Sequence, residues 1–137
     1  MTRRICQQVA FALLLVQIVG CSQDELNGVA VNGRVSYQGQ PIESGEIIFR
    51  STSGNLDVYA KIEAGRFEIL NDKGLMPGAY RVEVYSPQKT GKMIPDPDEP
   101  ALTTAEIYEL LPAKYNEMTE LTRQIEATTN ELLFKLE

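Results

Sequence analysis

The chain has 137 residues, of which 43% are hydrophobic and 23% charged, and this composition predicts one globular domain. Its 19 acidic and 13 basic residues give a net charge of −6, so we expect no basic surface for nucleic acid. The chain has no histidine, which removes the commonest general base and the commonest metal ligand. We therefore expect neither catalytic activity nor a cofactor.

Residues 1–20 have the features of a secretory signal peptide. Arg3 and Arg4 precede an apolar run over residues 9–19, which is shorter than the roughly 20 residues that span a membrane as a helix. Residues 18–21 (IVGC) then resemble the lipobox of bacterial lipoproteins, in which a small residue precedes the lipid-carrying cysteine. We expect lipidation of Cys21. The alternative is a signal for soluble secretion followed by an incidental cysteine.

Lipidation of Cys21 would place the protein in the cell envelope. Attached acyl chains hold a protein on a membrane without a membrane-spanning helix. Residues 21–28 are polar and predict a short tether, and Ser22 after the cysteine favours the outer membrane over the inner one. The twin arginines leave the export route open between the general secretory and the twin-arginine pathways.

Residues 29–137 alternate between apolar and polar positions with period two, which predicts an all-β domain. Turn-forming residues divide the pattern into seven short strands, and we expect them to form an antiparallel sandwich. Arg123 occupies an inward position, so its strand is either an edge strand or shifted in register by a bulge. The predicted strands are residues 29–37, 45–50, 57–63, 66–70, 80–84, 121–126 and 132–136.

A long excursion over residues 86–116 interrupts the strand pattern. Its five prolines argue against a continuous strand. Residues 103–106 (TTAE) have the spacing of a capping box, and the apolar residues that follow predict a short helix over 104–110. Because long connections in compact domains are usually functional or mobile, we expect the contact surface of the protein here.

Six short motifs occur in order along the mature chain. They are residues 31–35 (VNGRV), 39–41 (GQP), 45–49 (GEIIF), 65–69 (GRFEI), 77–82 (PGAYRV) and 111–116 (LPAKYN). Together, behind a lipobox, they resemble the carboxypeptidase regulatory-like (transthyretin-like) domains of small bacterial lipoproteins. The resemblance implies a seven-stranded Greek-key sandwich that serves as a non-catalytic accessory or binding module. Enzymes of similar fold depend on histidine, so their activities do not carry over.

The excursion also contains an acidic cluster of Asp96, Asp98 and Glu99. Carboxylates at alternating positions are typical Ca²⁺ ligands. However, the flanking prolines stiffen the backbone and the glycine turn of a calcium loop is missing. We therefore favour a solvated acidic loop over a metal site.

Four further residues are candidates for binding: Tyr85, Tyr108, Lys114 and Tyr115. Exposed tyrosines can stack on sugar rings, although the chain has no tryptophan. For Tyr115 a structural role is the alternative, in which its ring covers the core and Asn116 fixes the next turn. Two hypotheses follow: a module that binds another envelope protein, or one that binds a small ligand or glycan. An apolar, edge-like surface at the excursion would favour the first, and a concave aromatic cleft the second.

Overall fold

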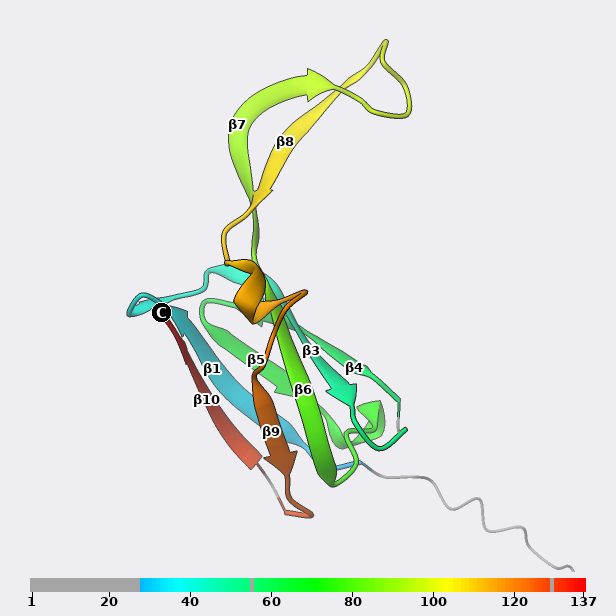
Figure 1. Cartoon of the computed structure of the whole chain (residues 1–137), viewed down its shortest axis with the longest axis vertical. Coiled ribbons are helices and arrows are strands. Elements are labelled where there is room, and N and C mark those ends of the chain that lie inside the picture. Colours follow the sequence, from blue (N-terminus) through cyan, green and yellow to red (C-terminus); the bar gives the residue numbers. More distant parts are fainter. Residues whose placement is uncertain (1–27, 55, 129) are drawn as a thin grey trace, which may run out of the picture.

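The computed structural model describes residues 28–54, 56–128 and 130–137, and strands make up most of this part of the chain (Figure 1). The prediction of an all-β fold is therefore confirmed. The proposed signal peptide, Cys21 and nearly all of the tether lie outside the described residues. Among the residues that are described, no helix combines the length and apolar character needed to cross a membrane.

Eight strands form one sheet, which we call the body. Its order is β10-β1-β5-β4-β3-β6-β9, and the short β2 pairs with β1. The seven strands of this path coincide with the seven predicted from the sequence. The strands are β1 (Val31–Tyr37), β2 (Gln40–Pro41), β3 (Ser44–Ser51), β4 (Val58–Glu63), β5 (Arg66–Ile69), β6 (Gly78–Tyr85), β9 (Thr122–Ile125) and β10 (Asn130–Leu136).

All neighbouring strands of the body are antiparallel except β1 and β10, which are parallel. The expectation of a wholly antiparallel arrangement is therefore wrong at this pair. The order of the strands in the sheet explains this parallel pairing. Five antiparallel steps lead from β1 to β9, so β9 runs opposite to β1, and the turn after β9 reverses the chain once more. β10 must then run in the same direction as β1.

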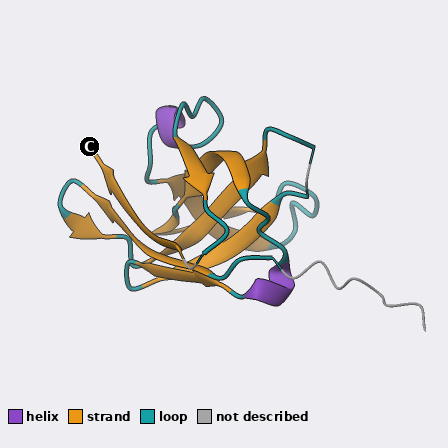
Figure 2. Cartoon of the chain, turned by 90° about the horizontal axis from the view of Figure 1, so that it is seen from below, coloured by secondary structure: helices purple, strands orange, loops and turns teal. Residues whose placement is uncertain are grey.

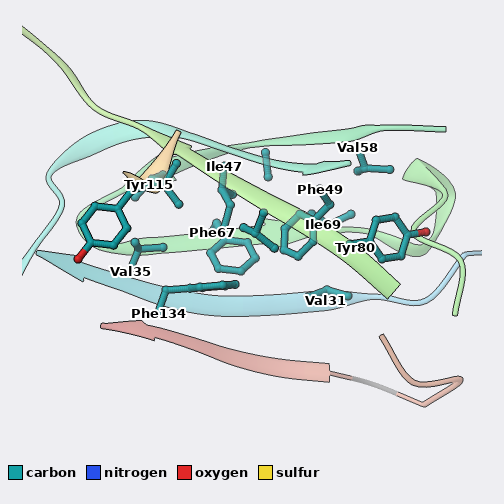
Figure 3. Close-up of a cluster of buried hydrophobic side chains, with 14 of the residues drawn as sticks. Val31, Val35, Ile47, Phe49, Val58, Phe67, Ile69, Tyr80, Tyr115 and Phe134 are labelled. Atoms are coloured by element: carbon teal, nitrogen blue, oxygen red, sulfur yellow. The ribbon is translucent and has the colours of Figure 1, made fainter. Parts of the chain in front are cut away.

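The body curls so that its inward face encloses the core (Figure 2). An aromatic cluster joins the two sides of the curl, with Phe49 of β3 at its centre (Figure 3). The Phe49 ring centroid lies 6.0 Å from that of Phe67 on β5, 6.2 Å from that of Tyr80 on β6 and 6.5 Å from that of Phe134 on β10. Tilted and edge-to-face aromatic pairs at these distances add stabilisation beyond their buried area.

Strand alternation explains which side chains enter this core. In β1, Val31 and Val35 are buried, whereas Arg34 between them is exposed. Gly33 shares the inward face, and a Cβ atom there would lie 2.6 Å from the Phe67 ring. Glycine therefore allows the ring to pack directly on the β1 backbone.

Arg123 lies where the curled sheet ends. β9 is the last strand of the path, so the edge-strand alternative for Arg123 is confirmed. The Arg123 guanidinium lies 4.6 Å from the Phe134 ring centroid and donates a 3.4 Å hydrogen bond to the Leu133 carbonyl on β10. No strand pairing links β9 to β10 in the described chain, so this cation–π contact covers the open seam between them.

The helix predicted over residues 104–110 is wrong, because these residues belong almost entirely to a strand. β7 (Pro87–Pro95) and β8 (Thr103–Glu109) form a separate antiparallel hairpin. Pro87 and Pro95 lie at the two ends of β7, an edge position that tolerates the missing N–H. The described helical elements are two short 3₁₀ turns, η1 (Asn71–Lys73) and η2 (Ala113–Tyr115).

Candidate functional site: a projecting hairpin

The β7–β8 hairpin projects from one end of the body (Figure 1). Its strands pair with each other and, within the described residues, with no other strand. Four large apolar side chains are largely exposed along it: Met93 (62%), Leu102 (56%), Ile107 (59%) and Tyr108 (49%). Large exposed apolar side chains that gather on one element are typical of interaction surfaces.

Strand pairing divides the side chains of the hairpin between two faces. Met93 pairs with Ala105 and Lys89 with Ile107, and directly paired residues share a face, so Met93, Ala105 and Ile107 lie together. We call this the apolar face. The opposite face carries Glu106, which accepts a 2.6 Å hydrogen bond from the Thr90 hydroxyl. Lys89 shares the apolar face with Ile107, and Tyr108 and Ile94 lie on the same face as Glu106. Both faces therefore mix polar and apolar side chains, and neither face covers the core.

A buried polar contact fixes the base of the hairpin. Ser86 is fully buried and donates a 2.8 Å hydrogen bond from its hydroxyl to the Ser44 carbonyl of β3. One carboxylate oxygen of Glu109 accepts the Ser86 amide at 2.8 Å and the Leu111 amide at 3.0 Å. Glu109 therefore joins the two ends of the hairpin where they leave the body.

The acidic cluster lies at the tip. A side-chain oxygen of Asp96 accepts hydrogen bonds from the Asp98 amide at 2.9 Å and the Glu99 amide at 3.1 Å. This is a local turn in which the aspartate satisfies the backbone. Across the described chain, no three acidic residues or cysteines are grouped so that they could hold a metal ion.

Tyr85 lies on the outward face of β6, where it joins an ionic cluster that the sequence did not indicate. Its hydroxyl donates a 3.3 Å hydrogen bond to Glu83, which is only 3% exposed. Arg50 Nε lies 2.5 Å and Arg81 Nη2 3.0 Å from the same oxygen of Glu83. An outward strand position predicts exposure for Glu83, and nothing in its immediate sequence signals that neighbouring side chains cover it.

The cluster shifts the pKa values of its members. Burial acts to raise the pKa of Glu83, but the hydrogen bond and charge of Arg50, with support from Tyr85 and Arg81, hold it below its ordinary value. Burial and the charge of Glu83 raise the pKa of Tyr85. Each polar group in the cluster is already bound to a neighbour, so the arrangement acts as a structural ion-pair network.

Tyr115 is buried, with 8% of its surface exposed, and it fastens the carboxyl end to the body. Its hydroxyl donates to the Glu137 carbonyl and accepts from the Glu137 amide at 2.7 Å. The Lys114 ammonium lies 4.8 Å from the Tyr115 ring centroid. Asn116 donates a 3.3 Å hydrogen bond to the Leu111 carbonyl and so fixes the turn. These contacts match the structural alternative for Tyr115.

The four binding candidates do not form one site. Tyr108 lies on the hairpin, Tyr85 belongs to the Glu83 cluster, and Lys114 lies over the buried Tyr115. Three hollows on the described part of the chain lie elsewhere, and none of these four residues lines them. The excursion thus presents an apolar strand surface, which is the feature expected for a protein partner.

Comparison with known proteins does not assign the chain to a family. The sequence matches no protein-family model, and no curated protein is significantly similar to it.

Proposed function

We propose that this chain is a lipid-anchored, non-catalytic β-sandwich module of the bacterial cell envelope, and that its hairpin binds another envelope protein. The observation that carries the proposal is the apolar face of the hairpin, where Met93 and Ile107 are more than half exposed. A partner can cover this face, or it can add a strand to a free edge of β7 or β8.

The proposal includes a transthyretin-like Greek-key sandwich as the fold. Two features support it. The seven predicted strands coincide with those of the body path, and the Phe49 cluster joins strands from the two sides of the curl. In this arrangement the body is a rigid support, and the hairpin is an elaboration of the connection between β6 and β9.

The anchor would be a lipid on Cys21. Nine residues, 22–30, separate that cysteine from β1, and a fully extended segment of this length reaches roughly 30 Å. A tether this short keeps the body close to the membrane, so the partner would be a membrane protein or one held near the surface. We expect labelled palmitate to be incorporated into the wild-type chain but not into Cys21→Ser, which would appear in the soluble fraction.

In-cell photo-crosslinking tests the role of the hairpin. Photoreactive residues at Met93 and at Ile107 should each capture the same discrete protein, identified by mass spectrometry. Tyr59 is the matched control, because it is 54% exposed but lies on the body. Capture from Tyr59 alone, or no protein adduct from either hairpin position in the anchored protein, would contradict the proposal.

A further inference from the structure

An open hollow of about 540 Å³ lies on the outer face of the body, over β1, β4 and β5. Two smaller hollows adjoin it, and Arg34 of β1 lines all three. Arg66 of β5 lines two of them. These two arginines are therefore shared between neighbouring hollows, and they are remote in sequence from the hairpin.

Arg34 and Arg66 are directly paired across β1 and β5. Like charges at directly opposed positions of a sheet destabilise it, unless something neutralises them. Glu63 is the cross-strand neighbour of Arg66 on β4, yet neither arginine forms an ion pair or hydrogen bond within the described chain. No direct contact neutralises either guanidinium group, although Glu63, Glu68 and Glu131 line the same hollow together with Lys61.

The other arginines of the described chain behave differently. Arg50 and Arg81 bind Glu83, and Arg123 lies over an aromatic ring. The whole chain carries six more acidic than basic residues, so carboxylates are not scarce. Two arginines that are paired across neighbouring strands, line the same hollow and have no ion-pair partner indicate a position for an external anion.

We propose that Arg34 and Arg66 bind the carboxylate or phosphate group of a small, hydroxyl-rich ligand such as an acidic or phosphorylated sugar. The planar guanidinium group presents paired donors that match either oxyanion. Two residues before Arg34 on β1, Asn32 lies between Glu68 on β5 and Glu131 on β10, and all three line the hollow. Carboxylate and amide oxygens accept hydrogen bonds from hydroxyl groups, so this row suits the uncharged part of the ligand.

Leu133 completes the surface on the other side of Arg34. It pairs with Arg34 across β1 and β10 and is 53% exposed. An exposed aliphatic side chain beside a guanidinium group offers contact to the C–H face of a sugar ring. The site is separate from the hairpin, so the inference does not depend on the hairpin's partner.

The test is a titration of the full chain in nonionic detergent, followed by NMR of the isotope-labelled protein. The probes are glucuronate, glucose 6-phosphate and uncharged glucose. We expect saturable shifts in β1 and β5 with at least one of the two anions, and the tighter binder identifies the oxyanion. Arg34→Gln and Arg66→Gln should each weaken that binding about tenfold, as expected for loss of a charge-assisted contact. Glucose should bind about tenfold more weakly than the preferred anion.

Lys92→Gln is the matched control, because it removes one positive charge from the hairpin and should leave the affinity unchanged. The melting temperature separates a binding role from a structural one. Arg34 is directly paired with Arg66 and Leu133 but with no carboxylate, so relief of the repulsion in Arg34→Gln should raise Tm by roughly 1–4 °C at low salt. Loss of a structural arginine would lower Tm instead. The inference is overturned if neither anion binds, if glucose binds as tightly as the anions, or if both arginine variants keep full affinity.

Discussion

The body and the β7–β8 hairpin are both made of β-strands, but only the body encloses a core. Ile47 and Phe49 of the body are completely buried, whereas Met93 and Ile107 of the hairpin are more than half exposed. Full burial of a large apolar side chain stabilises a fold by about 1.5–3 kcal/mol, and the hairpin gains little of this. Stability therefore resides in the body, and the apolar residues of the hairpin are available for a partner.

Removal of the central ring should produce the largest effect on the body. Phe49→Ala leaves a cavity among Phe67, Tyr80 and Phe134, and we expect it to lower the free energy of unfolding by about 3–5 kcal/mol. Urea denaturation followed by circular dichroism measures this. Phe49→Leu keeps most of the volume and should cost clearly less. Equal losses in the two variants would show that the cavity is not the cause.

This contrast between body and hairpin also marks what the sequence could predict. In the body, period-two alternation follows burial on one face, so all seven strands of the path were predicted. The sequence does not predict the parallel pairing of β10 with β1, because the direction of a strand depends on the order of all strands in the sheet and not on the local pattern. The sequence does not predict the hollow either, because its two arginines lie on strands that are far apart in the sequence.

The sequence predicts a helix in the hairpin because its local signals conflict. Residues 103–106 fit a capping box, and Ile107, Leu110 and Leu111 fit helical spacing. The β-branched and aromatic residues Thr103, Thr104 and Tyr108 favour a strand instead. What decides between them is the pairing with β7, which is closed by the tip around Asp96. That long-range pairing overrides the local helix signal.

Loss of the buried Glu83 carboxylate should have the next largest effect on the stability of the body. Glu83→Gln removes the charge that Arg50 and Arg81 bind, and we expect it to destabilise the body by about 1–3 kcal/mol near neutral pH. Glu46→Gln is the matched control, since Glu46 lies on the neighbouring strand, is exposed and forms no ion pair in the described chain. Similar denaturation midpoints for both variants would argue against the network.

The same cluster predicts a pH dependence. Because the folded state lowers the pKa of Glu83, its ion pairs stabilise the fold above the ordinary value of about 4.5. This contribution is lost as the pH falls through the lowered pKa. The stability difference between wild type and Glu83→Gln should therefore be full near pH 7 and shrink steadily below about pH 4.5. A difference that stays constant down to pH 2 would contradict the assignment.

Loss of the hydrogen bonds that hold the carboxyl-terminal residue should lower the free energy of unfolding by a smaller amount. Tyr115→Phe keeps the ring against Tyr37 but removes the hydroxyl that binds both backbone groups of Glu137, and we expect a loss of about 1–2 kcal/mol. Tyr108→Phe removes a hydroxyl from the hairpin, where no hydrogen bond to the described residues is lost, and it should be neutral. Faster hydrogen exchange at the end of β10 in Tyr115→Phe alone would locate the effect.

The smallest effect on stability should come from the apolar face of the hairpin. Ile107→Thr keeps a β-branched residue in the strand but removes an exposed apolar group, so we expect a change within about 0.5 kcal/mol. The equivalent change in the body, Ile47→Thr, places a hydroxyl in the core and should cost several times more. If capture of a partner is lost in Ile107→Thr while stability is kept, the apolar face serves binding. A loss of stability above about 1 kcal/mol would instead show that the hairpin packs against the body, and the contrast between the two regions would fail.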